Sequence, residues 1–295
     1  MDHHDTSRRF MIDDSAIRGE WALLDASYMN VVAKHNYPME LQSMLGQMMA
    51  AAVMLSSTIK FDGTLIMQAR GGSPVSLITV ECTHEKEIRA LARWNGDVSN
   101  QSFKEMLNGA QLSITVTPKD GERYQGIVPL QGDSLAQCLE HYFQQSEQLK
   151  TRIWLTEGDN KAAGLLIQVM PFSSEVKIDD EQMAEDWNRV TLLADTLTAE
   201  EHLGINPEGL LFRLFHEEKV RLFEEQPIEF KCNCSKDRFA DAIAMLDRDE
   251  VDEILKENGN ITANCEYCNE TYVFDEVDIG ALFAMAPAQS SDRQH

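Results

Sequence analysis

Four cysteines in two close pairs constrain this chain more than any other feature of its sequence. One residue separates Cys232 from Cys234, two residues separate Cys265 from Cys268, and 30 residues lie between the pairs. Side chains at i and i+2 of an extended strand project to one face, and residues i and i+3 converge in a tight turn, so each pair can present two sulfurs to one ion. Four thiolates favour tetrahedral zinc and leave no open coordination position. The spacing therefore predicts one structural zinc ion per chain, held by Cys232, Cys234, Cys265 and Cys268.

The residues between and after the two pairs predict a small folded unit. Ser235 is placed to cap a helix, Gly259 is placed to end a second, shorter helix, and residues 261–274 read as two short strands around the second cysteine pair. About 60 residues are too few to build a robust core without help. We therefore expect bound metal to supply most of the folding free energy of this unit.

This dependence on metal makes a redox switch one hypothesis for the cysteines. Oxidation within each pair would replace a long-range link through the metal with two local loops, which restrict the chain little. Four cysteines allow three connectivities, and the spacing does not choose among them. A permanent zinc site with no redox role explains the same spacing. Cys82 and Cys138 lie outside the motif, and we expect both to be buried, inert thiols.

The first part of the chain mixes helical and strand periodicities and predicts an α+β core domain. Apolar residues recur at three- and four-residue spacings over 37–60, as on one face of a buried helix. A second helix is expected over 134–150, with Asp133 or Ser134 as its cap. Alternating apolar residues and turn signals predict strands at 63–70, 75–82, 110–117, 124–129 and 165–170.

From Ile178 to Phe223 the pattern indicates helices alone. Glutamates at 217, 218, 224 and 225 crowd the expected end of the last of these helices and oppose its macrodipole, so this end should be weakly held. The predicted domains are an α+β core domain at 1–173, an amphipathic helical linker at 174–230, a small zinc-binding domain at 231–287 and a flexible tail at 288–295.

Charge limits the partners that the chain can bind. The sequence has 49 acidic and 26 basic residues, and residues 174–295 alone carry 29 acidic and 11 basic ones, a net charge of −18. Nucleic acids and anionic membranes both require clustered Lys and Arg, so neither is an expected partner. The first ten residues lack the apolar stretch of a secretory signal, and the longest apolar tract, Met44 to Leu55, is too short to span a bilayer. A cytoplasmic location is expected.

The combination of motifs resembles the oxidation-activated chaperone family called heat-shock protein 33. The zinc motif of that family is similar to Phe230-Lys-Cys-Asn-Cys-Ser235 and Asn264-Cys-Glu-Tyr-Cys-Asn269. Its N-terminal core resembles Tyr37-Pro38 with Leu45-Gly46, Ile59-Lys-Phe-Asp-Gly63, Gly132-Asp-Ser-Leu-Ala136 and Tyr142-Phe-Gln-Gln-Ser-Glu-Gln148, and its helical linker resembles Trp187 with Thr191-Leu-Leu-Ala-Asp-Thr-Leu197. The likeness covers nearly the whole chain.

The resemblance implies a stress-response holdase that works without ATP and is not an enzyme. It implies that zinc on the four cysteines keeps the reduced protein inactive. Oxidation would then form the disulfides Cys232–Cys234 and Cys265–Cys268, release zinc, unfold the C-terminal region and loosen the linker. The resemblance further implies that the active form dimerises and binds unfolding client proteins.

Two other functions fit parts of the sequence. A thiol-disulfide oxidoreductase would use Cys265 and Cys268, but the residues around this pair lack a thioredoxin-like βαβ pattern. A constitutive zinc-ribbon module would bind a protein or a nucleic acid. The acidity of the C-terminal region opposes binding of a nucleic acid.

Overall fold

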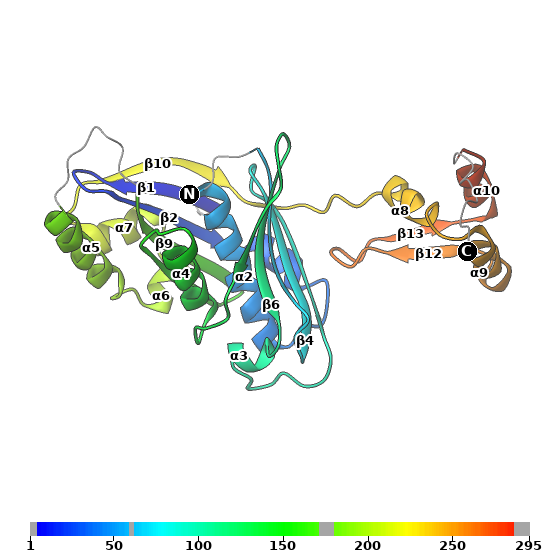
Figure 1. Ribbon diagram of the computed structural model, residues 1–295, viewed down its shortest axis with the longest axis horizontal. Helices are drawn as coiled ribbons and strands as arrows, with labels where there is room; N and C mark the ends of the chain where they lie inside the picture. The colour runs from blue at the N-terminus through cyan, green and yellow to red at the C-terminus, as the bar shows by residue number, and fades with distance from the viewer. Residues whose placement is uncertain (1–4, 59–61, 171–179, 286–295) are drawn as a thin grey trace. The chain divides into compact units, whose positions relative to one another are not determined.

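The computed structural model describes residues 5–58, 62–170 and 180–285, and its contacts divide the chain into two units. The larger unit comprises Met1–Lys231 and the smaller comprises Cys232–His295 (Figure 1). Both helices and sheets are present, so the predicted α+β class is confirmed. The expected border at 173/174 and the expected tail at 288–295 lie outside the described residues. The division into four domains therefore stays a prediction.

Two sheets form the framework of the larger unit. The five-stranded sheet has the order β10-β1-β2-β9-β8 and the six-stranded sheet has the order β11-β5-β4-β3-β6-β7. The strands of the first are β1 (Thr6–Ile12), β2 (Ile17–Leu24), β8 (Thr151–Gly158), β9 (Lys161–Val169) and β10 (Val220–Pro227). Those of the second are β3 (Gly63–Arg70), β4 (Val75–Thr83), β5 (Glu87–Trp94), β6 (Gln111–Pro118), β7 (Tyr124–Val128) and β11 (Glu229–Phe230). The strands predicted from alternation match β3, β4, β6, β7 and β9, whereas β1, β2, β5 and β8 were not anticipated.

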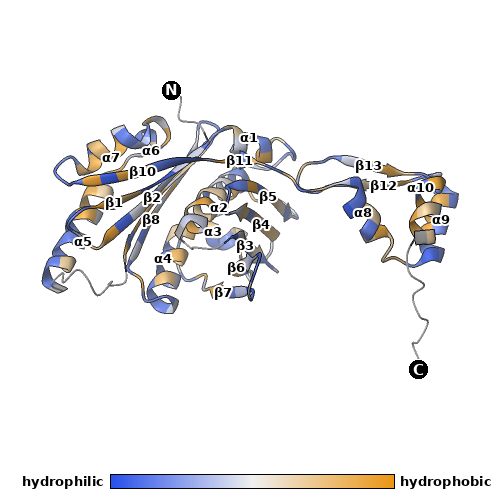
Figure 2. Ribbon diagram, turned by 90° about the horizontal axis from the view of Figure 1, so that it is seen from above, coloured by the Kyte–Doolittle hydropathy of each residue, from blue (hydrophilic) through white to orange (hydrophobic). Residues whose placement is uncertain are grey.

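Helix α2 (Met39–Thr58) lies between the two sheets and forms the centre of the main core. The predicted buried helix is confirmed, but its burial is not limited to one face, because every residue from Met48 to Ser56 is buried. A helix that packs against a sheet on each side has no solvent-facing stripe. Figure 2 shows hydrophobic residues along α2.

Shorter helices complete this part of the unit. They are α1 (Ala26–Val32), α3 (Phe103–Met106) and α4 (Leu135–Ser146). Ser134 caps α4 by accepting a hydrogen bond from the backbone N–H of Gln137, which selects Ser134 from the two predicted caps. Helix α4 ends at Ser146, four residues before the predicted end.

Three helices pack on the face of the five-stranded sheet opposite to α2. They are α5 (Asp180–Ala194), α6 (Ala199–Gly204) and α7 (Pro207–Phe215). Their buried residues, such as Val190, Leu203 and Leu210, share a second core with the alternate side chains of β1, β2 and β9. Side chains of a strand alternate between the two faces of its sheet, so this core is separate from the one around α2.

The expectation of helices alone through Phe223 is wrong. Helix α7 ends at Phe215, and residues 220–227 form strand β10, which pairs antiparallel with β1. Val220 and Leu222 pack against the second core, as a period of two requires. Of the four glutamates expected at the helix end, only Glu217 and Glu218 directly follow α7, because Glu224 and Glu225 lie on the strand.

Within its described residues, 232–285, the smaller unit contains a hairpin and three helices. Its elements are α8 (Lys236–Ile243), α9 (Arg248–Asn258), β12 (Ile261–Asn264), β13 (Thr271–Phe274) and α10 (Glu276–Met285), of which α10 was not anticipated. Ser235 caps α8, and Gly259 ends α9 in the left-handed conformation, as predicted. Its core has four buried residues, Ile243, Val251, Phe274 and Ile279. So few buried side chains leave little hydrophobic stabilisation for a unit of this size.

Candidate metal centre

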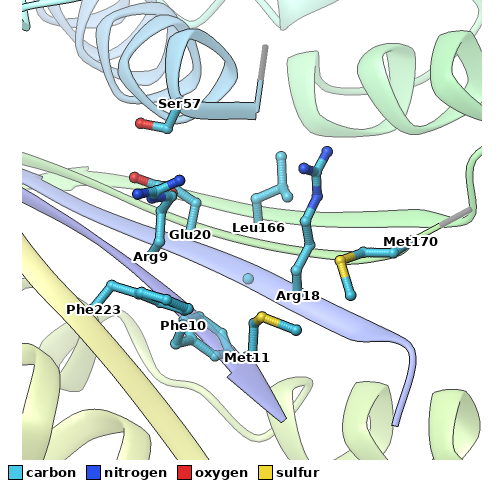
Figure 3. Close-up of a pocket in the computed structure, with 10 residues that line it drawn as sticks. Arg9, Phe10, Met11, Arg18, Glu20, Ser57, Leu166, Met170 and Phe223 are labelled. Carbon is cyan, nitrogen blue, oxygen red and sulfur yellow. The ribbon is translucent and has the colours of Figure 1, made fainter. Parts of the chain in front are cut away.

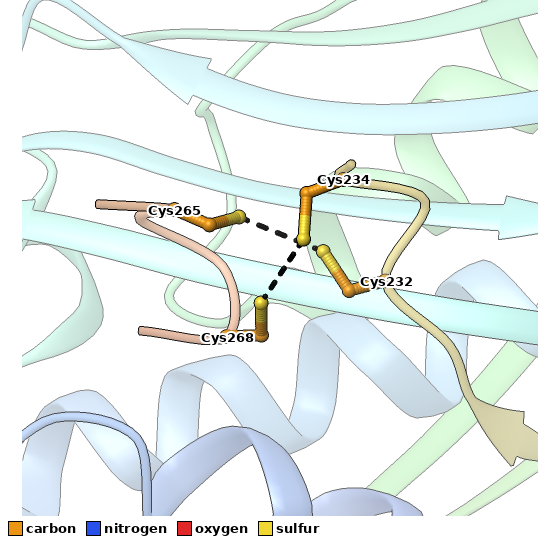
Figure 4. A group of neighbouring side chains, drawn as sticks. All are labelled: Cys232, Cys234, Cys265 and Cys268. Carbon is orange, nitrogen blue, oxygen red and sulfur yellow. Dashed lines mark hydrogen bonds between the residues drawn. The ribbon is translucent and has the colours of Figure 1, made fainter. Parts of the chain in front are cut away.

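The smaller unit brings the four predicted cysteines together. Cys232 and Cys234 precede helix α8, and Cys265 and Cys268 lie in the turn between β12 and β13. The turn is tied by backbone bonds from Cys265 N to Glu270 O at 2.9 Å and from Asn269 N to Cys265 O at 2.7 Å, and Asn269 adopts a positive φ of 60°. Figure 4 shows the four side chains converging from these two segments.

The four sulfurs have the spacing of a metal site. All lie within 4.8 Å of one another, with Cys232 Sγ 3.6 Å from Cys265 Sγ and Cys234 Sγ 3.4 Å from Cys268 Sγ. Zinc–sulfur bonds of about 2.3 Å in a tetrahedron place neighbouring sulfurs about 3.8 Å apart. The cluster therefore fits a tetrahedral ion, and its four soft sulfur donors suit zinc.

These two sulfur contacts each join one cysteine of the first pair to one of the second. All four thiols are free. The geometry therefore leaves all three disulfide connectivities open.

Hydrogen bonds and burial shift the pKa values of the Cys232, Cys234 and Cys268 thiols in different directions. Burial raises the pKa of Cys232 and Cys268, although backbone N–H groups of Cys234 and Glu270 respectively act against this rise. Burial also acts to raise the pKa of Cys234, but the Tyr272 hydroxyl, 3.2 Å from its sulfur, and the neighbouring thiols outweigh it and lower this pKa. The Cys234 sulfur is thus better stabilised as a thiolate than those of Cys232 and Cys268.

The remaining two cysteines are buried in the larger unit, as expected. Cys82 on β4 lies 3.5 Å from Ser56 Oγ, and Cys138 on α4 accepts a hydrogen bond from the Gly132 N–H at 3.3 Å. Burial raises the pKa of both thiols. A buried thiol with a raised pKa is a poor nucleophile at neutral pH.

A buried polar group that the sequence did not single out lies on β2. The Glu20 side chain is 2% exposed and lines a pocket of about 140 Å³ with Arg9, Arg18 and Ser57 (Figure 3). Burial raises the pKa of Glu20 to about 7, against the effects of Lys86, Ser57, Arg9 and Arg18. The sequence around Glu20 carries no signal of this burial, because the surroundings of the side chain come from distant segments.

Comparisons with known proteins agree over almost the entire chain. A family model described as Hsp33 protein matches residues 5–275. A 33 kDa chaperonin of Ectopseudomonas mendocina is 46% identical over 97% of this chain and 98% of its own, and one of Nitrosococcus oceani is 44% identical over 96% of each. The crystal structure of the 33 kDa chaperonin of Thermotoga maritima matches with a TM-score of 0.79 at 20% identity, covering 95% of this chain and 98% of that one.

These matches define a class of proteins with this fold whose curated members are named chaperonins. The chain belongs to the Hsp33 family, and the resemblance noted in its motifs is confirmed. No helix within the described residues is long and apolar enough to cross a membrane.

Proposed function

We propose that this protein is a redox-regulated holdase chaperone that works without ATP, in the cytoplasm, and is not an enzyme. One observation carries the proposal: the four cysteine sulfurs of an Hsp33-family chain converge in a unit that has only a small core of its own. In such a unit the metal holds the fold together, so chemistry at the sulfurs controls folding.

In the reduced state, Cys232, Cys234, Cys265 and Cys268 bind one zinc ion per chain. When bound, zinc supplies a cross-link between the segment before α8 and the β12–β13 turn. Because four sulfurs fill a tetrahedral site, the role is structural and leaves no position for a substrate.

Oxidation then converts the four sulfurs to the disulfides Cys232–Cys234 and Cys265–Cys268. Formation of each disulfide removes two electrons from two thiolates. One molecule of hydrogen peroxide accepts both electrons and is reduced to two hydroxide ions. Disulfide sulfurs no longer hold the metal, and the two short loops constrain the unit far less than the cross-link did. The smaller unit therefore unfolds.

A short strap links this event to the larger unit. We define the strap as residues 220–231, which pair first with β1 through β10 and then with β5 through β11. Backbone bonds from Glu229 N to Lys86 O at 3.1 Å and from Lys231 N to Ile88 O at 3.0 Å end the strap, and the Lys231 ammonium pairs with Glu87. The next residue is Cys232, so unfolding of the smaller unit frees one end of the strap.

Release of the strap and of helices α5 to α7 exposes the apolar face of the five-stranded sheet. Phe10, Trp21 and Leu165 are fully buried there. Once exposed, this apolar sheet face binds unfolding proteins and favours a homodimer of the oxidised chain. Neither nucleic acid nor membrane is a partner, given the net charge of −23.

The test records zinc content and suppression of client aggregation together. Peroxide with mild heat is expected to release about one zinc per chain and to create suppression, and a thiol reductant should reverse both. Cys82→Ser is the control that retains the cluster, and Cys268→Ser is the variant that lacks it. Equal suppression by the reduced, zinc-loaded protein would refute the switch.

Peptide mapping of the oxidised protein tests the pairing. The proposal expects disulfides within each pair. Disulfides from Cys232 to Cys265 and from Cys234 to Cys268 would keep the two segments linked and would contradict it.

A further inference from the structure

Tyr272 contacts the cysteine cluster through its hydroxyl group. The Tyr272 oxygen lies 3.2 Å from Cys234 Sγ, 38 positions away in the chain. A sulfur that binds metal is a thiolate and carries no proton, so in the loaded site the hydroxyl is the donor.

The position of this hydroxyl is fixed from two sides. The backbone of Tyr272 belongs to β13 and pairs with Ala263 of β12. Its ring packs on Phe239 of α8, with the ring centroids 5.1 Å apart. Phe at position 272 would retain both contacts, so the hydroxyl is separable from the structural role of the ring.

The hydrogen-bond donors to the sulfurs of Cys232 and Cys268 are backbone groups, unlike the side-chain donor to Cys234. Backbone N–H groups of Cys234 and Glu270 act on Cys232 and Cys268. Such donors are retained whatever side chain is present. Tyr272 instead brings a side-chain donor to the cluster, and a single substitution removes it.

We propose that Tyr272 is a positioning residue whose hydroxyl donates a hydrogen bond to Cys234 Sγ and slows the oxidation of this sulfur. The inference rests on the proposed redox switch and adds a residue that sets its sensitivity.

The effect follows from the chemistry of the first oxidation step. The Cys234 sulfur attacks one oxygen of hydrogen peroxide, so an S–O bond forms, the O–O bond breaks and hydroxide leaves. Attack by the Cys232 sulfur on the resulting sulfenic acid forms the S–S bond and releases the second hydroxide. Two sulfurs thus lose two electrons in total, and one peroxide gains them.

A hydrogen bond withdraws electron density from the attacking sulfur. For free thiols, lower basicity also increases the thiolate fraction, which offsets the loss of nucleophilicity. A metal-bound sulfur is already fully deprotonated, so its thiolate fraction cannot increase. The hydrogen bond therefore only lowers the nucleophilicity of this sulfur. A tenfold drop in basicity lowers the nucleophilicity of a sulfur about threefold.

Tyr272→Phe in the zinc-loaded full-length protein tests the inference. Samples taken at intervals after peroxide addition are quenched with an alkylating agent and mapped by mass spectrometry. We expect Cys234 to be oxidised roughly threefold faster than in the wild type, with unchanged initial rates at Cys265 and Cys268. Tyr124→Phe, which removes a hydroxyl near Tyr142 and Glu147 in the larger unit, is the matched control and should leave all rates unchanged.

Two results would overturn the inference. Equal rates in Tyr272→Phe and wild type would show that the hydroxyl has no effect, and equal acceleration at all four cysteines would show a general loosening. A cobalt-loaded sample gives an independent readout, because loss of the hydrogen bond should move the sulfur-to-metal charge-transfer band to lower energy. An unchanged band would also count against the hydroxyl.

The wild-type arm separates this inference from the proposed function. A wild-type chain that binds no metal, or that keeps its metal in peroxide, would refute the proposed function and the inference with it. A wild-type chain that releases metal as expected, beside a variant with the same kinetics and spectrum, would refute the inference alone.

Discussion

Single buried residues illustrate how the surroundings of a side chain change its chemistry. His202 on α6 is fully buried against the five-stranded sheet, and its Nδ1 lies 2.8 Å from Thr156 Oγ1. Burial lowers the pKa of His202 to about 4, and the Gly164 backbone opposes this only in part. The folded protein therefore holds this imidazole neutral at physiological pH.

The pH dependence of stability should carry the signature of His202. An unfolded His has a pKa near 6.5, so the unfolded chain binds the proton first as pH falls. The contribution of neutral His202 to the free energy of unfolding is on the order of 3 kcal/mol. It is complete above about pH 6.5 and is lost as the pH falls to about 4. Denaturant unfolding at several pH values is the measurement, with His202→Gln beside the wild type.

Comparison with the variant is required because Glu20 acts in the opposite direction. The pKa of Glu20 is about 7 in the folded protein, above its unfolded value. The contribution of the protonated Glu20 to the free energy of unfolding is therefore lost as pH rises from about 4.5 to 7. The difference between wild type and His202→Gln cancels the Glu20 effect. A pH-independent difference would contradict the assignment to His202.

Lys86 gives a second prediction at the level of one residue. Its buried ammonium donates to Val53 O at 3.3 Å, to Ser56 Oγ at 2.7 Å and to Ser57 Oγ, near the C-terminal end of α2. A positive charge at this end of a helix is favourable, and Lys86 also offsets the charge of Glu20. Lys86→Met should cost about 3 kcal/mol of unfolding free energy, because it leaves these acceptors without a donor.

The matched control for Lys86 is Lys119→Met. Lys119 pairs with Asp62 at 2.9 Å, and 64% of its side chain is exposed. We expect no measurable change in its denaturation midpoint, because solvent screens such pairs. Similar losses in the two variants would show that burial of Lys86 is not the cause.

Among the elements, strand β10 differs most from its prediction. It lies at the edge of the five-stranded sheet and pairs only with β1 among the described strands. The four polar residues of Arg221-Leu-Phe-Glu-Glu-Gln226 obscure the apolar period of two that a strand would show. The partner residues on β1 lie more than 200 positions away, as in Met11 and Arg221. Sequence periodicity cannot report a partner at that distance, so the segment was assigned to a helix.

Hydrogen exchange can follow β10 during oxidation. In the reduced, zinc-loaded protein, the amides of β10 bonded to β1 should be protected. After peroxide treatment they should exchange freely, because the strap loses its anchor at Cys232, whereas β9, which pairs on both sides, should stay protected. Unchanged protection of β10 would separate the strap from the switch.

At the scale of the whole molecule, the two units differ in what stabilises them. The larger unit has two extensive apolar cores. The described part of the smaller unit has one core cluster of four buried residues, and residues 232–295 carry a net charge of −9 from 14 acidic and 5 basic residues. Four thiolates around the proposed Zn²⁺ would add a formal charge of −2. Self-repulsion therefore opposes folding of the smaller unit, and the cross-link through a bound metal would have to outweigh it.

Metal removal should consequently unfold one unit and spare the other. A strong chelator under reducing conditions is expected to abolish the NMR dispersion of residues after 232 and to leave that of the larger unit intact. High salt should partly restore the apo unit, because it screens like charges. A dispersed spectrum of the smaller unit without metal would contradict the prediction.

The sequence by itself determined the features that depend on neighbouring residues. The cysteine spacing located the cluster, Ser235 and Gly259 set helix ends, and the apolar spacing over 37–60 identified the central helix. Each of these signals lies within a few residues of the structure it specifies, so a single stretch of chain contains the information.

Only the tertiary structure decided which distant segments meet. It made residues 220–227 a strand by supplying β1 as a partner, surrounded α2 with sheets on both sides, buried Glu20 and His202, and placed the Tyr272 hydroxyl on Cys234. Burial and hydrogen-bond partners arise from packing between elements. The physical reason is that a residue's own type and spacing fix its local conformation, whereas its solvation and its neighbours depend on the whole fold.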